Sequence, residues 1–173
     1  MSVKETEEQY HRRLAGYLDG KDPLAMQRAA VAKLSKLMEN VPELELHRKP
    51  APEKWSVVEI LAHLADAELV VGWRLRSILS APGSPIQAYD QDAWASHGQY
   101  AKRDPRKSLE RFRILREANL ELIKSLTPEQ RKQFGLHSER GEESIDRLTH
   151  LIAGHDLNHL EQIEAILTRK PRG

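Results

Sequence analysis

The sequence predicts an all-α fold, a four-helix bundle with a short extra N-terminal helix. Two observations support this prediction. Apolar residues recur at steps of three and four along most of the chain, and no segment shows the alternation of a half-buried strand. Four of these periodic segments are long, and long amphipathic helices bury their apolar faces against one another in a bundle. The length of 173 residues fits a single domain over residues 1–173.

Two helices are predicted before residue 41. The first covers residues 6–18 and ends at Asp19-Gly20. The second covers residues 23–40, with Asp22 as its N-cap and Pro23 at the first helical position, where the missing N–H costs nothing. Its apolar stripe consists of Leu24, Val31, Leu34, Leu37 and Met38.

The next helix has a clear start after an irregular, proline-containing link over residues 41–54. Ser56 followed by Glu59 is typical of a capping box, in which the hydroxyl accepts from one free backbone N–H and the carboxylate accepts from another. The helix is predicted to continue to residue 79, because the sequence Ala81-Pro82-Gly83-Ser84-Pro85 cannot extend it.

A long loop and two further helices complete the predicted bundle. Residues 86–104 are predicted to be loop-like, and a loop of this length is often functional, so a role as a lid is one interpretation. One helix is predicted over residues 105–126 and the last over residues 144–169. Between them, Thr127-Pro128-Glu129-Gln130 begins a further turn, followed by a polar stretch through residue 141.

Three histidines lie on the predicted inner faces of two helices. His155 and His159 are one turn apart, in register with Leu148 and Ile152 on the stripe of the last helix, and His63 lies at or beside the stripe that begins with Ile60. If the two helices pack together, the three imidazoles converge. Three neutral imidazoles with an open fourth position form a divalent metal site suited to catalysis.

A structural role for these histidines is the alternative, since a histidine on an apolar seam is usually a hydrogen-bonded core residue. The metal site is favoured because three buried polar rings are costly without a partner, whereas one ion compensates all three. The remaining histidines are interpreted as surface residues: His11, His47, His97, His137 and His150.

Several polar residues stand one turn from these histidines and are candidates to orient them. Metal-bound imidazoles usually donate their remaining N–H to a carboxylate or carbonyl oxygen. Glu59 and Asp66 flank His63 in this way, while Asp156 and Gln162 lie three residues before and after His159. Each also has a simpler interpretation as a solvated helix residue, and Glu59 already has a role in the predicted capping box.

Composition excludes several classes of function. Lys and Arg total 27 against 26 Asp and Glu, so the chain lacks the basic character of a nucleic-acid-binding protein. Cysteine is absent, which excludes disulfides, thiolate nucleophiles and Cys-type zinc sites. The polar start of the chain does not resemble a secretory signal, and no apolar run reaches the ~20 residues of a membrane helix. We therefore expect a soluble, cytoplasmic protein.

Three segments resemble signatures of the DinB-like superfamily. The segment from Trp55 to Glu68, Trp-Ser-Val-Val-Glu-Ile-Leu-Ala-His-Leu-Ala-Asp-Ala-Glu, is similar to its first signature. The segment from His155 to Ile163, His-Asp-Leu-Asn-His-Leu-Glu-Gln-Ile, is similar to its closing signature. Tyr89-Asp90-Gln91-Asp92-Ala93-Trp94 is similar to the central loop of many members. The resemblance covers nearly the whole chain in the right order.

This resemblance implies a down-up-up-down bundle with a three-histidine site for zinc or nickel, and it assigns the ligand roles to His63, His155 and His159. Similar proteins include hydrolases, thiol S-transferases that use bacillithiol or mycothiol, and a maleylpyruvate isomerase, and many are homodimers. The resemblance does not fix a reaction, because a metal ion with open positions supports several chemistries on one scaffold.

We therefore predict a metal-dependent enzyme of hydrolase or thiol S-transferase type, acting on a small-molecule substrate. The ion would lower the pKa of water or of a low-molecular-weight thiol cosubstrate. Asp90 and Glu59 are the candidates for a catalytic base, and Asp156 stands where a zincin motif would need its glutamate. Two alternatives stay open: a non-catalytic metal-binding or stress-response protein, and a structural bundle that binds a partner through Trp73 or Trp94.

Overall fold

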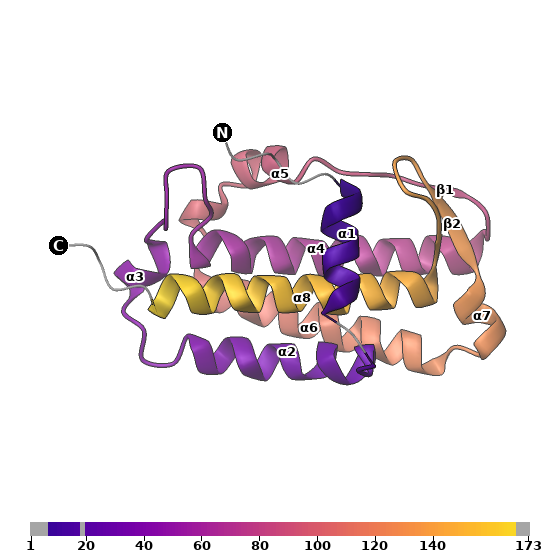
Figure 1. Ribbon diagram of the computed structural model, residues 1–173, viewed down its shortest axis with the longest axis horizontal. Coiled ribbons are helices and arrows are strands. Elements are labelled where there is room, and N and C mark those ends of the chain that lie inside the picture. Colours follow the sequence, from indigo (N-terminus) through magenta and orange to yellow (C-terminus); the bar gives the residue numbers. More distant parts are fainter. Residues whose placement is uncertain (1–6, 18–19, 169–173) are drawn as a thin grey trace.

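Four long helices lie side by side in the computed structural model, which describes residues 7–17 and 20–168 (Figure 1). The helices are α2 (Pro23–Leu37), α4 (Val57–Ser80), α6 (Pro105–Ser125) and α8 (Ile145–Thr168). A shorter helix, α1 (Glu7–Gly16), precedes them. The prediction of an all-α four-helix bundle with a short extra helix is confirmed. No helix in the described ranges is long and apolar enough to cross a membrane.

The helices run in the order down-up-up-down, as the resemblance implied. In Figure 1, α2 and α8 run in one direction, whereas α4 and α6 both run in the other. Because α4 and α6 are parallel, residues 81–104 must return along the full length of the bundle before α6 can begin. This explains the long loop of the sequence, which passes over α4 (Figure 1).

The predicted helix starts are confirmed by their caps. The Asp22 carboxylate accepts a hydrogen bond from the Leu24 backbone N–H at 2.9 Å. Ser56 and Glu59 form the capping box: Glu59 Oε2 accepts from the Ser56 backbone N–H at 2.8 Å, and the Ser56 hydroxyl accepts from the Glu59 N–H at 3.3 Å. These bonds satisfy N–H groups that have no partner inside the helix.

The prediction that the chain contains no strand is wrong. A three-stranded sheet consists of β1 (Pro85–Ile86), β2 (Phe134–His137) and β3 (Gly141–Ser144), with β1 parallel and β3 antiparallel to β2. Strands of two to four residues are too short to show a period of two in the sequence. The polar stretch before residue 144 is therefore a hairpin, closed by Gly141 at a φ of 71°.

Short helices also interrupt the segments that the sequence predicted to be irregular. Helix α3 (Glu43–His47) lies in the link, α5 (Gln91–His97) and the 3₁₀ turn η1 (Tyr100–Lys102) lie in the loop, and α7 (Pro128–Lys132) forms the further turn. None exceeds seven residues, so none could show a repeated apolar spacing. The loop of residues 86–104 is consequently an ordered cover over α4.

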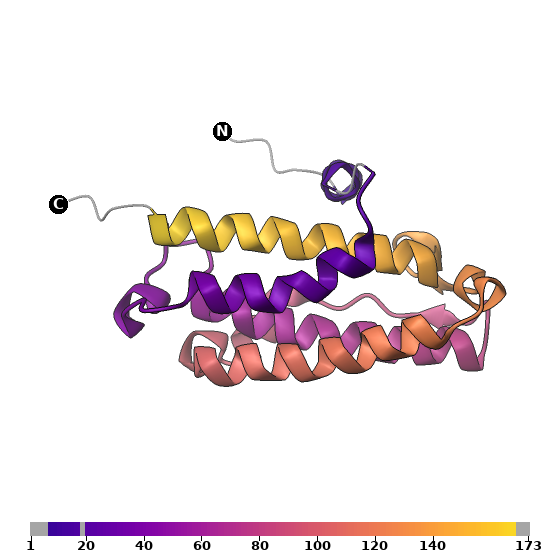
Figure 2. The same ribbon diagram turned by 90° about the horizontal axis from the view of Figure 1, so that it is seen from below.

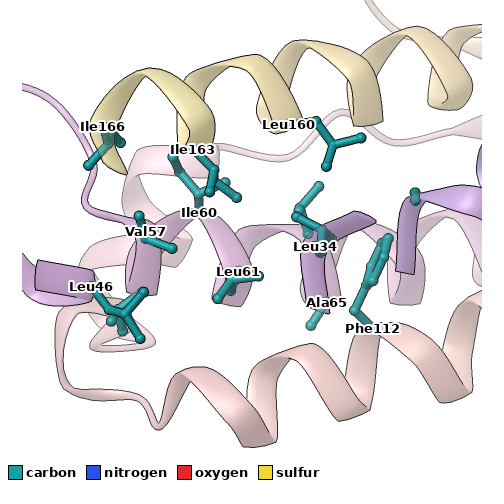
Figure 3. Close-up of a cluster of buried hydrophobic side chains, with 13 residues drawn as sticks. Leu34, Leu46, Val57, Ile60, Leu61, Ala65, Phe112, Leu160, Ile163 and Ile166 are labelled. Carbon is teal, nitrogen blue, oxygen red and sulfur yellow. The ribbon is translucent and has the colours of Figure 1, made fainter. Parts of the chain in front are cut away.

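The apolar core consists of two clusters at opposite ends of the bundle. Figure 3 shows the first, where side chains of α2, α4, α6 and α8 meet: among them are Leu34, Val57, Ile60, Leu61, Phe112, Leu160 and Ile163. The second cluster contains Val71, Leu75, Ile78, Ile86, Ile123, Ile145, Leu148 and Ile152. Buried polar residues of α4, α6 and α8 lie between the two clusters: Glu68, Arg116, Asn119, Asp156 and Asn158.

Arg116 is the centre of this polar layer. Its guanidinium donates to both carboxylate oxygens of Asp156, at 2.6 and 2.9 Å, and to Glu68 Oε1 at 2.8 Å. Asn119 donates to the other oxygen of Glu68 at 3.0 Å, and Arg116 also donates to the Gln27 carbonyl at 3.1 Å. The two buried carboxylates are thus held by one buried cation and a ring of hydrogen bonds.

Helix α1 crosses the outer side of α8, and Figure 2 shows it end-on above that helix. The two helices come close at Gly154, where a Cβ atom would lie 2.3 Å from the Leu14 carbonyl oxygen. Arg13 donates to Asn158 at 2.5 Å, and the Tyr17 hydroxyl donates to Glu161 at 2.6 Å. A residue without a side chain at position 154 therefore allows the two backbones to touch.

Candidate metal centre

His63, His155 and His159 meet between α4 and α8. The Nε2 atom of His155 lies 2.9 Å from His63 Nε2 and 3.1 Å from His159 Nε2. The candidate ligand nitrogens of all three rings lie within 4.8 Å of one another. The structure therefore brings together the three residues that the sequence singled out, and the group could hold a metal ion.

The neighbouring helices fix the orientation of these rings. His155 and His159 occupy successive turns of α8, and their ring centroids are 4.5 Å apart. The ring of Trp55, just before α4, packs on His63 with a centroid separation of 5.0 Å. His159 Nδ1 lies 3.0 Å from Gln162 Oε1, so a protonated Nδ1 can donate to this oxygen and leave Nε2 as a free lone pair.

The geometry fits a divalent ion. Ligand nitrogens about 2.0–2.1 Å from a tetrahedral ion lie roughly 3.3 Å apart, close to the Nε2 separations of the cluster. Without an ion, His155 Nε2 faces two other ring nitrogens, and a single neutral nitrogen cannot donate well to both. An ion accepts a lone pair from each ring. His63 Nδ1 is buried with no hydrogen-bond partner among the described residues.

Burial keeps the three imidazoles neutral. It lowers the pKa of His63 and of His155 well below the ordinary histidine value, and the neighbouring His159 lowers both further. Burial also lowers the pKa of His159 to about 4, against a smaller opposing effect of the hydrogen bond to Gln162. Neutral imidazoles carry the lone pair that a metal ion needs.

These pKa values predict that the metal-free protein loses stability as the pH falls from about 6.5 to about 4. In that window the unfolded chain binds protons on histidines that the folded state keeps neutral, so the stabilisation present above about 6.5 disappears with acid. Urea unfolding at a series of pH values measures the effect. His159→Gln should make the free energy of unfolding less dependent on pH. An unchanged pH dependence in that variant would contradict the low pKa of His159.

The carboxylates predicted to orient the histidines have other partners. Asp66 accepts from the Tyr100 hydroxyl at 2.7 Å and from Arg103 Nη1 at 3.1 Å. Asp156 is held by Arg116 in the polar layer. Of the residues considered, Gln162 alone shows a contact with a histidine of the cluster within the described part of the chain.

The two candidates for a catalytic base also have structural roles. Glu59 accepts from Ser56 in the capping box and forms an ion pair with Lys49 Nζ at 2.9 Å. Asp90 is exposed at the N-cap of α5, where it accepts from the Ala93 N–H at 2.9 Å. Neither carboxylate lines either of the two cavities that adjoin the histidines, but Tyr89 and Gln91, the neighbours of Asp90, line the one beside His155.

His137 corrects the interpretation of the other histidines as surface residues. It is 3% exposed, because β2 carries it inward against α4, where its Nε2 lies 3.1 Å from Nη2 of Arg74. His47, His97 and His150 are exposed, as expected, and the side chain of His11 lies outside the described residues. No local pattern revealed His137, because its burial depends on pairing between distant strands.

Two cavities adjoin the histidine cluster. The first has a volume of about 230 Å³, and His155 forms part of its wall together with Tyr89 and Arg74. The second has a volume of about 570 Å³ and is lined by His159, Trp55 and Gln162. Gln91 lines both. Each cavity therefore has one histidine of the cluster in its lining.

Comparison with known proteins gives a consistent result. The family model described as the DinB superfamily matches residues 26–163. Among curated proteins, the chain is 25% identical over 136 residues to a "putative metal-dependent hydrolase" of Oceanobacillus iheyensis, covering 79% of this chain and 78% of the relative. It is 26% identical over 138 residues to a protein of the same description from Halalkalibacterium halodurans, with 80% of each chain covered.

The fold has a close counterpart among solved structures. The structure of YfiT from Bacillus subtilis, described as "a probable metal-dependent hydrolase with an unusual four-helix bundle topology", superposes with a TM-score of 0.78. The match covers 96% of this chain and 91% of YfiT at 21% sequence identity. At that identity the likeness establishes the bundle and its unusual helix order.

Proposed function

The chain belongs to the DinB superfamily, and from this premise and the geometry of its histidines we propose that it is a metal-dependent hydrolase of small molecules. His63, His155 and His159 would hold one divalent ion, zinc or nickel, both of which accept imidazole nitrogen. The observation that supports the proposal most is the convergence of three buried ring nitrogens beside two cavities. A purely structural site would be closed by a fourth protein ligand.

When bound, such an ion supplies Lewis acidity, which lowers the pKa of water and polarises a substrate carbonyl. The residues of the chain position the substrate and limit access of solvent. The apolar side chains Val71 and Ile152 form part of one wall beside His155. Gln162 keeps the lone pair of His159 directed at the cluster. Asp90, on the loop over the cavity, is the remaining candidate for the base.

A thiol S-transferase is a second candidate, and the second cavity is the observation that favours it. A transferase binds two reactants, whereas a hydrolase needs room for one substrate and a water molecule. The cavity of about 570 Å³ on the His159 side could take a low-molecular-weight thiol while the smaller one holds the electrophile. We also propose that the protein is a cytoplasmic homodimer; light scattering of the purified protein tests the oligomeric state.

Metal removal and restoration test the proposal. After chelation and dialysis, the protein is expected to have no activity on a panel of small esters, amides and lactones, and one equivalent of zinc or nickel should restore it. The same panel with an added thiol and a halogenated or epoxide electrophile distinguishes transfer from hydrolysis. Stoichiometric metal without turnover of any substrate would instead favour the non-catalytic metal-binding alternative.

A further inference from the structure

Arg74 is a buried cation in the wall of the smaller cavity, and its guanidinium is only partly paired. It is 6% exposed and lies on α4. Nη2 donates to the Gln87 carbonyl at 2.7 Å, but Nη1 reaches Glu143 only at 4.0 Å. Nε is buried without an acceptor in the described part of the chain. A buried guanidinium normally satisfies more of its five N–H groups.

His137 adds a second donor without an acceptor. Its Nδ1 lies 3.2 Å from the Glu139 backbone N–H, and its Nε2 lies 3.1 Å from Nη2 of Arg74. A neutral imidazole accepts at one nitrogen and donates at the other, so one of these two contacts brings two donors together. Burial, and then Arg140 and Arg74, lower the pKa of His137 to about 4, so the ring is neutral.

Neither carboxylate near Arg74 forms a hydrogen bond with it in the described part of the chain. Glu143 is held by Arg140, which donates to its two oxygens at 3.0 and 2.9 Å. Glu139 is exposed at the rim of the cavity. Burial and the Arg140 guanidinium lower the pKa of Arg74, and these effects outweigh the opposing effects of both carboxylates. The buried Arg74 guanidinium therefore lines the cavity without a carboxylate in hydrogen-bond contact among the described residues.

The cavity joins this cation to the histidine cluster through an apolar passage. On α4, residues 63, 67, 71 and 74 recur at steps of three and four, so His63 and Arg74 share one face of the helix. Their α carbons are roughly 16 Å apart along the axis. Ala67 and Val71 of α4 and Ile152 and His155 of α8 also line this cavity.

We propose that this cavity binds a small monocarboxylate substrate, with its carboxylate on Arg74 and its apolar part directed towards His155. The planar guanidinium matches a single carboxylate, and its Nε and Nη1 have no hydrogen-bond acceptor among the described residues. The substrate carboxylate would also accept a hydrogen bond from the N–H that has no acceptor at the contacts of His137. The volume of about 230 Å³ lies below the usual range for drug-sized ligands, which limits the substrate to a small molecule. The placement of the reacting bond near His155 rests on the proposed function, but binding of the carboxylate does not.

Binding of hexanoate, compared with neutral hexanamide, tests this proposal. Isothermal titration of protein freed of metal by chelation and dialysis removes any contribution of an ion. Wild type is expected to bind hexanoate at least about tenfold more tightly than hexanamide, because hydrogen bonds to a charged group are the stronger kind. Arg74→Met should lose that preference, and Arg74→Lys should retain part of it.

Arg76→Met is the matched control, since Arg76 lies two residues further along α4 and is exposed. It should bind hexanoate like wild type. Equal affinity of wild type for hexanoate and hexanamide would overturn the proposal, as would wild-type hexanoate binding by Arg74→Met. If Arg74→Met does not fold, the preference for hexanoate over hexanamide is compared between Arg74→Lys and Arg76→Met. Equal preferences in these two variants would overturn the proposal. Tighter binding of inorganic phosphate than of hexanoate would overturn the assignment to a carboxylate.

The proposed metal-dependent activity and the proposed carboxylate site can be tested independently of each other. His63→Ala should lose the metal ion but retain the preference for hexanoate, since His63 does not line this cavity, whereas Arg74→Met should retain one ion per chain and lose the preference. Metal-free wild type that prefers hexanoate would therefore support the carboxylate site even if no hydrolase activity were found.

Discussion

His155→Ala is expected to abolish stoichiometric binding of a divalent ion, and turnover with it. His155 is the central residue of the cluster, because its Nε2 lies next to the Nε2 atoms of both other histidines. Two imidazoles retain an ion far less well than three, and loss of even an orienting partner costs about 10–100-fold in affinity. We therefore expect affinity for zinc or nickel to fall by more than about a hundredfold.

His150→Ala is the control for this experiment. His150 lies on the same helix but is exposed, and its Nδ1 is 2.8 Å from the Asp146 carbonyl oxygen. It should retain about one ion per chain by elemental analysis, with unchanged activity. Metal retained at full stoichiometry in His155→Ala would contradict the site, as would equal losses in the two variants.

Arg116→Met is expected to destabilise the protein by about 3–5 kcal/mol, the usual cost of removing one partner of a buried ion pair. Glu68 and Asp156 are 2% and 3% exposed, and both depend on Arg116 for their compensating charge. Methionine fills much of the same volume but leaves two carboxylates facing each other in the bundle. Either their pKa values must rise or the layer must admit water, and both weaken the folded state.

Urea unfolding at neutral pH measures this difference. Arg113→Met, one turn earlier on α6, is the control: Arg113 pairs with Glu110 and Glu117 on an exposed surface, so its loss should hardly move the unfolding midpoint. Similar midpoints for Arg116→Met and wild type would show that the polar layer is not held by this arginine. Folded Arg116→Met should still bind the metal ion, since Arg116 contacts none of the three rings by a hydrogen bond in the described chain.

The sequence predicted the long helices well because the information for them is local. The capping box at Ser56 and Glu59, and the apolar stripes of α4 and α8, depend on residues only a few positions apart. For the same reason the spacing of His155 and His159 predicted which face of α8 they share. The convergence with His63 needed one further assumption, that α4 and α8 pack together, and the structure confirms it.

The partners of the carboxylates and the short sheet could not be predicted, because both depend on residues far away in the chain. Spacing placed Asp66 and Asp156 near the histidines but could not show that Arg103 and Arg116 would reach these carboxylates first. The short sheet depends on pairing between residues 85–86 and 136–137, which no local pattern reports. Arg74 had a detectable signal, three turns from His63 on the same face, whereas the burial of His137 had none.

Helix α1 forms part of a cavity wall although it lies outside the segment that matches the superfamily. It ends at Gly16, ten residues before the match with the superfamily begins at residue 26, yet Leu14 lines the cavity that His155 also lines. The glycine at position 154 that admits this helix lies next to that histidine. The leading helix therefore helps to shape this cavity, whereas the three histidines lie in later stretches of the chain: exchanging residues 7–16 is expected to change the cavity without removing any of the three histidines.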